Sequence, residues 1–244
     1  MSVAHARVMA VVDTAPLPAT QPMPWPAATG LAIFDLDRTM VRGSSLAYLG
    51  RALAEARLLG RAELTRHLVR NLGFALRGAA PGTAERLQRM LLEALAGREQ
   101  APLVEVARTV GPVVAARAYP AARWLLDRHR AAADRCVLLS ASPQELVEAV
   151  AQALGFDAAV GTVAEVVHGR YTGLLAGPFC HGEGKLARLR DAVGPVGLAT
   201  AVAYADAASD APLLRACGSP VAVNPDARLR SLACTSGWPV LRLH

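Results

Sequence analysis

The chain has 244 residues, of which 53% are hydrophobic and 5% aromatic, and its formal net charge is +6. This length suits one sizeable core, or a core domain with a smaller insertion, and the composition excludes disorder throughout the chain. The 26 Lys and Arg residues are scattered without a basic run, which argues against a nucleic-acid partner. No uninterrupted apolar stretch has the length of a membrane-spanning helix.

The cysteines lie far apart and include no Cys-x-x-Cys pair: Cys136, Cys180, Cys217 and Cys234. This spacing indicates neither a zinc cluster nor a disulfide framework, so the expected compartment is the cytoplasm. The sequence carries no pattern that indicates an oligomeric state.

Residues 1–29 contain five prolines in their second half and are predicted to form a flexible N-terminal extension. The pattern changes at Gly30. Leu31 to Phe34 is a short apolar run that ends in Asp35, as expected of a buried parallel strand with polar residues at its carboxyl end.

The segment 45–131 is predicted to be helical throughout. Ser45 is expected to cap a helix that runs to about Leu59. Three later helices are predicted near 87–95, near 103–114 with an interruption at Gly111, and over 120–130. A further helix between the first and these three is predicted from four leucines that repeat at every fourth position: Leu64, Leu68, Leu72 and Leu76.

Strand and helix signals alternate after Asp134. A strand over 136–139 ends at Ser140, and Pro143 opens a helix that stops before Gly155 and that Ser142 is expected to cap. The later segments are predicted as a strand and hairpin over 158–173, a helix over 185–193, a strand over 201–204, a short helix over 212–217, and strands over 221–223 and 239–243. We therefore predict an α/β fold with a Rossmann-like parallel sheet core, formed by 30–44 and 132–244, and a helical cap, 45–131, inserted after the first strand.

Four polar clusters follow the predicted strands or open the helices beside them. Ligands of open α/β sheets bind beyond the carboxyl ends of the strands, so these clusters are expected to meet. Carboxylates gathered there repel one another unless a cation is present, and Asp35, Asp37 and Asp206 together indicate an oxygen-seeking ion such as Mg²⁺. Lys185 and the ion together could hold a phosphoryl group for attack by a carboxylate.

These residues resemble, in their order, the haloacid dehalogenase superfamily of phosphohydrolases, and specifically its phosphoserine-phosphatase-like branch, subfamily IB. The resemblance extends from about Gly30 to the C-terminus. Its motifs are matched by Asp35-Leu36-Asp37-Arg38-Thr39, by Ser140 after an apolar strand, by Lys185 within Gly182-Glu183-Gly184-Lys185, by Asp206 and Asp210 four residues apart, and by the stretch 220–225.

The resemblance implies a magnesium-dependent phosphatase that acts on a small phosphorylated metabolite. Asp35 would be the nucleophile and Asp37 the general acid and base. The metal would be held by the Asp35 carboxylate, the Asp37 carbonyl and Asp206, with Asp210 orienting its waters. The remaining implied roles are phosphate binding by Ser140 and Lys185, support of the Asp37 loop by Thr39, and a flap formed by 40–44.

Two positions depart from the pattern of phosphoserine phosphatases. A Glu that binds the amino group of the substrate there is replaced here by Ser44, and an Asn before the last Asp is replaced by Ser209. A hydroxyl cannot balance an ammonium as a carboxylate does, so phosphoserine is expected to be a poor substrate. An amino-alcohol phosphate, a lysophospholipid or a sugar phosphate is expected instead.

Two other functions are compatible with the motifs. A phosphotransferase or mutase would pass the phosphoryl group to an acceptor other than water. A non-catalytic phosphometabolite-binding protein could use the same fold.

Overall fold

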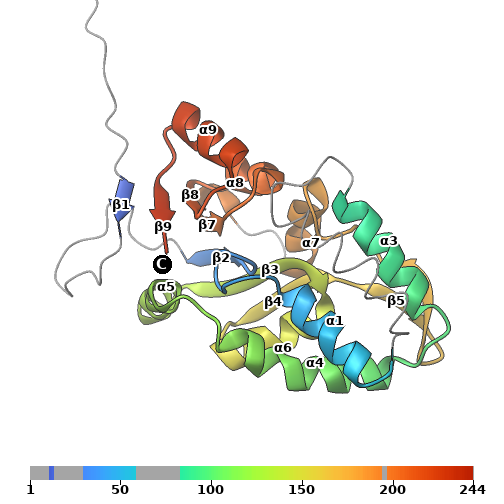
Figure 1. The fold of residues 1–244 in the computed structure, drawn as a ribbon. Coiled ribbons are helices and arrows are strands. Elements are labelled where there is room, and N and C mark those ends of the chain that lie inside the picture. The colour runs from blue at the N-terminus through green and yellow to red at the C-terminus, as the bar shows by residue number, and fades with distance from the viewer. Residues whose placement is uncertain (1–10, 14–29, 59–82, 194–196, 244) are drawn as a thin grey trace, which may run out of the picture.

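The computed structural model describes residues 11–13, 30–58, 83–193 and 197–243, and Figure 1 shows how their elements are arranged. The predicted helix around Leu64–Leu76 lies outside the described residues. So does the predicted N-terminal extension, apart from a three-residue strand. In chain order the elements are β1 (Val11–Asp13), β2 (Leu31–Asp35), α1 (Ser45–Glu55), α3 (Thr83–Leu95), α4 (Gln100–Ala115), α5 (Pro120–Ala131), β3 (Arg135–Pro143), α6 (Gln144–Leu154), β4 (Ala158–Thr162), β5 (Ala164–Val167), β6 (Arg170–Leu175), α7 (Glu183–Val193), β7 (Val202–Ala205), α8 (Ala211–Ala216), β8 (Ser219–Val223), α9 (Ala227–Ser236) and β9 (Val240–Arg242).

A parallel sheet forms the centre of the molecule, as predicted. Its strand order is β1-β9-β8-β7-β2-β3-β4, and every pairing in it is parallel. The strand β2 lies between β3 and β7, with Asp35 opposite Leu139 and Phe34 opposite Tyr204. All strands therefore present their carboxyl ends at one edge, and β2 brings Asp35 to the middle of that edge.

All five residues of β2 are buried because both faces of the sheet are covered. Ala32 and Phe34 belong to one hydrophobic cluster, and Leu31 and Ile33 belong to the other. This alternation explains why a strand buried on both faces is a continuous apolar run in the sequence. Burial of each large aliphatic side chain contributes about 1.5–3 kcal/mol.

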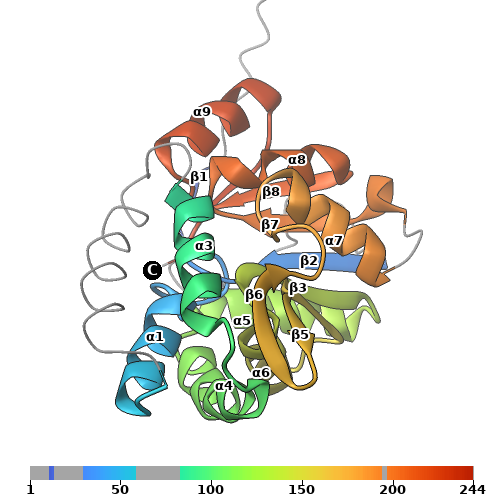
Figure 2. The same cartoon turned by 90° about the vertical axis from the view of Figure 1, so that its right-hand side faces the viewer.

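The helices form a layer on each face of the sheet (Figure 2). On one face α4, α5 and α6 contribute Leu103, Leu125 and Val147 to the first cluster. On the other face α7, α8 and α9 contribute buried leucines to the second cluster: Leu186, Leu189, Leu213 and Leu229. The described helices of the predicted cap include α1, α3, α4 and α5, and the cap bounds 45–131 remain a prediction.

The predicted interruption at Gly111 is wrong, because α4 runs unbroken from Gln100 to Ala115. The glycine instead permits a close approach to α6. A Cβ atom at Gly111 would lie 2.5 Å from the Cβ of Ala149, a distance that side chains essentially never reach. Gly111 is thus required for helix packing.

The hairpin of β5 and β6 supports the corner between α3 and α4. His168 and Gly169 form its two-residue turn, and both have positive φ angles, 49° and 74°. Gly97 donates its amide hydrogen to the Tyr171 carbonyl at 2.8 Å, and Arg170 forms an ion pair with Glu99 at 2.6 Å. The hairpin therefore fixes the helical part of the chain against the core.

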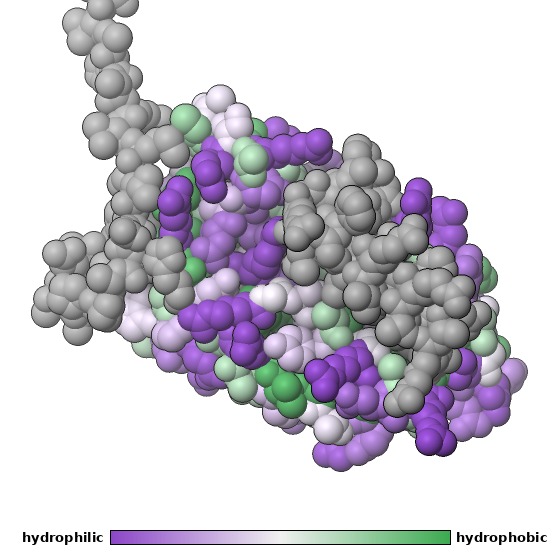
Figure 3. Space-filling view, viewed as in Figure 1, coloured by the Kyte–Doolittle hydropathy of each residue, from purple (hydrophilic) through white to green (hydrophobic). Residues whose placement is uncertain are grey.

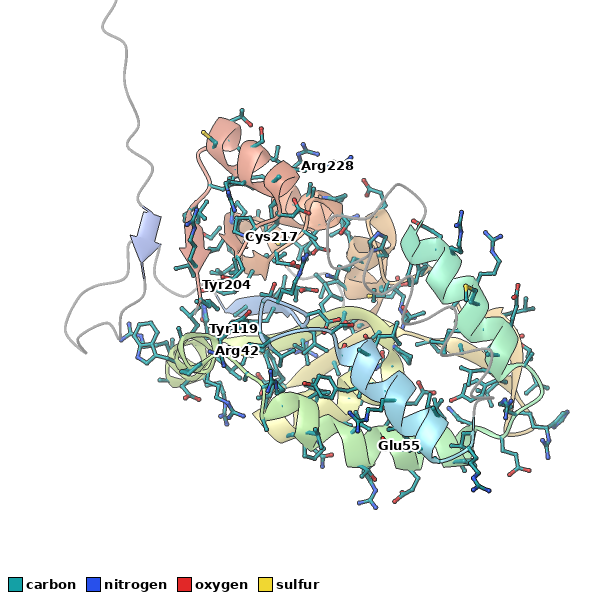
Figure 4. The ribbon with its side chains drawn as sticks, viewed as in Figure 1. Arg42, Glu55, Tyr119, Tyr204, Cys217 and Arg228 are labelled. Atoms are coloured by element: carbon teal, nitrogen blue, oxygen red, sulfur yellow. The ribbon has the colours of Figure 1, made fainter. Side chains whose placement is uncertain are left out.

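A buried polar chain connects α5 with the beginnings of the central strands. His129 Nδ1 lies 2.7 Å from Asp134 Oδ2, and His129 Nε2 lies 2.8 Å from the hydroxyl of Tyr204, which is labelled in Figure 4. Asp134 Oδ1 also accepts a hydrogen bond from the Gly30 amide at 2.7 Å. Both ring nitrogens of His129 are thus engaged in contacts that hold the fold together, at the amino ends of the strands and away from Asp35.

On the face shown in Figure 3, most of the described residues are hydrophilic, and the hydrophobic ones form small groups. Across the described ranges of the chain, no helix is both long and apolar enough to cross a membrane.

Candidate active site

Three carboxylates meet at the carboxyl edge of the sheet. Asp35 is the last residue of β2, Asp206 directly follows β7, and Asp210 ends a short 3₁₀ helix before α8. One oxygen atom from each lies within 4.8 Å of the others, and all three residues are buried. The parallel topology thus brings together residues that are up to 175 positions apart in the sequence.

Lys185 supplies positive charge to this cluster from the first turn of α7. Its Nζ donates to Asp35 Oδ1 at 2.6 Å and to Asp210 Oδ1 at 2.8 Å, and the residue is only 3% exposed. Gly184 allows α7 to begin here, because a Cβ at that position would lie 1.9 Å from the Phe179 carbonyl oxygen. Gly184 therefore permits the close backbone approach at the start of the helix from which Lys185 reaches the carboxylates.

The pKa values show how strongly burial acts on the cluster. Burial raises the pKa of Asp35 to about 6, although the adjacent Lys185 opposes the shift. Burial also raises the pKa of Asp206 well above its ordinary value, with the Asp35 charge acting in the same direction. For Lys185, burial alone would lower the pKa, but Asp210 and Asp35 together raise it. Three buried carboxylates thus share the positive charge of Lys185 and of the Arg38 guanidinium, which acts to lower the pKa of Asp206.

The cluster fits a hard divalent cation. Asp206 is buried, and its Oδ2 forms an ion pair with the Arg38 guanidinium. Carboxylate oxygens are preferred ligands of Mg²⁺, and a cation would offset the repulsion among these three groups. The donor set therefore suits magnesium better than a softer metal.

The loop after β2 is tied to distant parts of the core. Arg38 has a positive φ angle of 61°, which is unusual for a residue with a side chain. Its carbonyl accepts a hydrogen bond at 2.8 Å from the Asn224 side chain, whose oxygen accepts from the Leu243 amide at 2.7 Å. Asn224 thus anchors the loop to the end of β9.

Arg42 and Tyr119 lie where this loop meets the segment before α5. The Arg42 guanidinium lies over the Tyr119 ring, 4.7 Å from its centroid (Figure 4). The amide of Tyr119 donates to the Met40 carbonyl at 3.0 Å. The predicted flap, 40–44, is therefore supported by the residues that connect α4 with α5.

Asp37 points toward the first turn of α1. Its Oδ1 accepts from the Ser45 amide at 2.7 Å, and its Oδ2 accepts from Ser45 Oγ at 3.1 Å. Burial raises the pKa of Asp37, while the hydrogen bonds from Ser45 act in the opposite direction. The carboxylate is thus both desolvated and firmly oriented.

The remaining predicted residues, Ser140 and Thr39, are also buried at this edge. Ser140 is 2% exposed, and its Oγ accepts a hydrogen bond from the Ser142 amide at 3.1 Å. Thr39 is 1% exposed, and within the described part of the chain its hydroxyl has no hydrogen-bond partner. The roles of these two residues remain predictions.

Comparison with known proteins decides the family. The model described as "haloacid dehalogenase-like hydrolase" matches residues 32–215. The chain belongs to this family. The phosphoserine phosphatase SerB1 of Mycobacterium tuberculosis is 36% identical over 216 residues, which cover 87% of this chain and 70% of that protein. The predicted resemblance to the phosphoserine-phosphatase-like branch of the haloacid dehalogenase-like hydrolases is thereby confirmed.

Two further similarities cover nearly the whole of the matched proteins. The histidinol-phosphatase of Neisseria meningitidis is 31% identical over 218 residues, which cover 86% of this chain and 97% of that protein. The crystal structure of a protein with unknown function from Bordetella pertussis has 30% identity and a TM-score of 0.73, and the match covers 86% of this chain and 97% of that one. The α/β fold is therefore shared with the Bordetella pertussis protein.

The structure adds four residues that our sequence reasoning did not assign to the site: Arg38, Ser45, Asn224 and Asp226. Asp226 connects α9 with the Asp206–Asp210 loop. Its Oδ1 accepts from the Leu229 amide at 2.7 Å, its Oδ2 from the Ala208 amide at 3.2 Å, and its own amide donates to the Asp206 carbonyl at 2.9 Å. The sequence did carry a signal for Asp226, because Asp is a preferred N-cap residue directly before a helix.

Proposed function

We propose that this haloacid dehalogenase-like hydrolase is a magnesium-dependent phosphatase that hydrolyses a small phosphomonoester through an aspartyl-phosphate. The observation that supports this most is the buried cluster in which Lys185 bonds both Asp35 and Asp210 while Asp206 lies beside them. A carboxylate nucleophile, a fixed cation and further carboxylate oxygens are the groups that transfer of a dianionic phosphoryl group requires.

The proposed reaction has two steps. In the first, an Asp35 oxygen attacks phosphorus, the ester P–O bond breaks, and Asp37 gives its proton to the leaving oxygen. In the second, Asp37 takes a proton from water, the water oxygen attacks phosphorus, and the bond between Asp35 and phosphorus breaks. Inorganic phosphate leaves and both carboxyl groups return to their starting states.

Lys185 and Ser140 would bind oxygens of the phosphoryl group, and Thr39 would support the loop that carries Asp37. The metal would be held by the carboxylates of Asp35 and Asp206 and by the Asp37 carbonyl, with Asp210 contributing through bound water. A bound Mg²⁺ would supply charge neutralisation and alignment of the phosphoryl group.

Ser44 supports the proposal that phosphoserine is a poor substrate. It lies at the N-cap of α1, is partly buried, and makes no capping hydrogen bond through its side chain. It brings no negative charge to bind an ammonium group, although a relative is named a phosphoserine phosphatase. The histidinol-phosphatase relative makes amino-alcohol phosphates the first alternative to test, followed by lysophospholipids and sugar phosphates.

A panel of phosphorylated metabolites tests the proposal directly. Purified protein is incubated with each compound and Mg²⁺, and both inorganic phosphate and the dephosphorylated product are quantified. Stoichiometric phosphate indicates a phosphatase. Transfer to an added alcohol or sugar without phosphate release would instead indicate a phosphotransferase or mutase. Binding without turnover of any compound would indicate the non-catalytic alternative. The highest kcat/KM for phosphoserine would refute our interpretation of Ser44.

The cytoplasm remains the proposed compartment. The four cysteines of the described chain are all free in the structure, which fits a reducing environment.

A further inference from the structure

Asp37 receives hydrogen bonds on both of its carboxylate oxygens from one residue, Ser45. The amide donates to Oδ1 at 2.7 Å and the hydroxyl to Oδ2 at 3.1 Å. Ser45 is 0% exposed and Asp37 is partly buried, so the donor side of both bonds is shielded from solvent. Two bonds to the two oxygens fix both the position and the rotation of the carboxyl plane, which one bond could not do.

A second serine determines the direction of the Ser45 hydroxyl. Ser142 Oγ lies 2.8 Å from Ser45 Oγ, and Ser142 is 4% exposed. Once Asp37 has given its proton to the leaving oxygen, its ionised carboxylate only accepts hydrogen bonds, so in that state the single hydrogen of the Ser45 hydroxyl is donated to Asp37. The Ser142 hydroxyl must then donate to Ser45, and a chain of donors runs from β3 through Ser45 to Asp37.

Helix α1 contributes to the same contact. Ser45 is its first residue, and the helix has 11 residues, so the amide that faces Asp37 belongs to the positive end of a full helix dipole. The carboxylate is thereby attached to the first helix of the predicted cap, while Ser142 lies at the end of a core strand. Ser45 connects these two parts of the molecule at the acid and base of the proposed reaction.

We propose that Ser45, oriented by Ser142, is a positioning residue that holds Asp37 where it can protonate the leaving oxygen. This inference rests on the proposed function. It adds a residue outside the matched motifs and assigns to a buried serine pair a role in the departure of the leaving group. Near-attack geometry matters here because a misplaced acid loses much of its effect.

The loss of kcat/KM in a Ser45 variant should depend on the leaving group of the substrate, and this dependence distinguishes a positioning role from a purely structural one. A simple alkyl phosphate releases an alkoxide that needs a proton as the P–O bond breaks. The p-nitrophenolate of p-nitrophenyl phosphate leaves readily without one. A residue that acts through Asp37 must therefore affect the alkyl substrate more than the aryl substrate. A residue that only stabilises the fold would affect both alike.

The experiment compares kcat/KM for both substrates in Ser45→Ala, Ser142→Ala, the double variant and a control, Ser236→Ala. The constant kcat/KM reports the steps up to departure of the leaving group, so hydrolysis of the intermediate does not obscure it. Ser236 is an exposed serine in the last turn of α9. The alkyl substrate is the best alkyl phosphate of the metabolite panel.

We expect Ser45→Ala to lower kcat/KM about 30-fold for the alkyl phosphate and less than about threefold for p-nitrophenyl phosphate, since general acids contribute about 10²- to 10⁴-fold. Ser142→Ala should lower kcat/KM about threefold for the alkyl phosphate and leave it unchanged for p-nitrophenyl phosphate. The double variant should be no worse than Ser45→Ala, because both act through one hydroxyl. Ser236→Ala should match the wild type with both substrates.

Equal losses with the two substrates, or no loss with either, would overturn the inference while leaving the proposed function intact. If circular dichroism shows that Ser45→Ala does not fold, the selectivity of Ser142→Ala decides in its place. A wild-type protein that releases phosphate from neither substrate would overturn the proposed function, and this inference with it.

Discussion

Replacing Lys185 with Met removes a buried cation that donates hydrogen bonds to two members of the carboxylate cluster, Asp35 and Asp210. Met has nearly the length of Lys, so the packing around the chain is kept while the charge and both hydrogen bonds are lost. Asp35 and Asp210 are then left buried without the partner that lies 2.6 and 2.8 Å away. Removing one member of a buried ion pair costs about 3–5 kcal/mol, because the remaining charge stays desolvated.

The cost should depend on pH, and its sign follows from the pKa of Asp35. Burial already raises this pKa to about 6, and Lys185 opposes the shift, so Lys185→Met should raise it further. An aspartate with a raised pKa in the folded state holds its proton where the unfolded chain has lost it. Stability then falls as pH rises from about 4 through the folded-state pKa. Lys185→Met should therefore be more destabilised at pH 8 than at pH 5.

Urea unfolding of wild type and Lys185→Met at both pH values, with a chelator present, measures this difference. At pH 8 we expect a loss near 3–5 kcal/mol, which lowers Tm by about 10 °C for a chain of this size. Adding Asp35→Asn to Lys185→Met removes one unpaired charge and should recover part of the loss. Equal destabilisation at the two pH values, together with no recovery in the double variant, would refute the electrostatic reasoning.

Three further predictions follow from the site and from the buried thiols. Asp35→Asn should abolish turnover while circular dichroism and Tm show a folded protein, since it removes the nucleophile and keeps its volume; near wild-type phosphate release would contradict the mechanism. Exhaustive chelation should abolish activity and Mg²⁺ should restore it, so activity that survives chelation would exclude the proposed cofactor. Ca²⁺ should inhibit, because its larger and more flexible coordination shell lets a carboxylate bind through both oxygens. A thiol reagent should modify exposed Cys234 first in the native protein at pH 8, because burial raises the pKa to about 12 for each of Cys136, Cys180 and Cys217. Mass spectrometry identifies the labelled cysteine, and faster labelling of a buried one would contradict the structure.

The central strands and the cluster at their ends could be predicted because their signals are local. A buried parallel strand is a short apolar run, and the polar residue that ends it marks the edge at which ligands bind. Asp35 ends such a run and Asp206 follows another, so the parallel topology brings these two together. Lys185 opens α7 instead, and its place in the site was implied by the family resemblance. The α/β fold of the prediction is accordingly confirmed.

Helix α9 was not predicted, although its two ends carry signals. Asp226 caps its start through the Leu229 amide, and Gly237 ends it with a φ angle of 69°. Only Leu229 and Ala233 are buried in it, so the periodicity that indicates an amphipathic helix is weak between those ends. In this segment the capping residues indicate the helix more clearly than the hydrophobic periodicity does.

The serines show why side-chain contacts are harder to predict than elements. Ser45 was expected to cap its own helix, and Ser142 the helix after Pro143. Instead α1 has Ser44 at its N-cap, α6 has Pro143 there, and neither makes a capping hydrogen bond through its side chain. Ser45 and Ser142 bond to one another across 97 positions of the sequence. Local preference favours a cap, but a buried hydroxyl beside a carboxylate gains more from the charged acceptor.

The loop that carries Asp37 follows the same principle over a longer range. Its positive φ at Arg38 would favour glycine in isolation, so the local sequence gives no reason for the conformation. The conformation persists because the Arg38 carbonyl accepts from Asn224, the Arg38 guanidinium pairs with Asp206, and Asn224 in turn accepts from Leu243. Arg38 of the first motif is thus held by the side chains of Asp206 and Asn224, which follow β7 and β8, and the backbone amide of Leu243, which follows β9, holds Asn224 in turn. A motif can be recognised from five consecutive residues, but its geometry depends on the carboxyl ends of β7, β8 and β9.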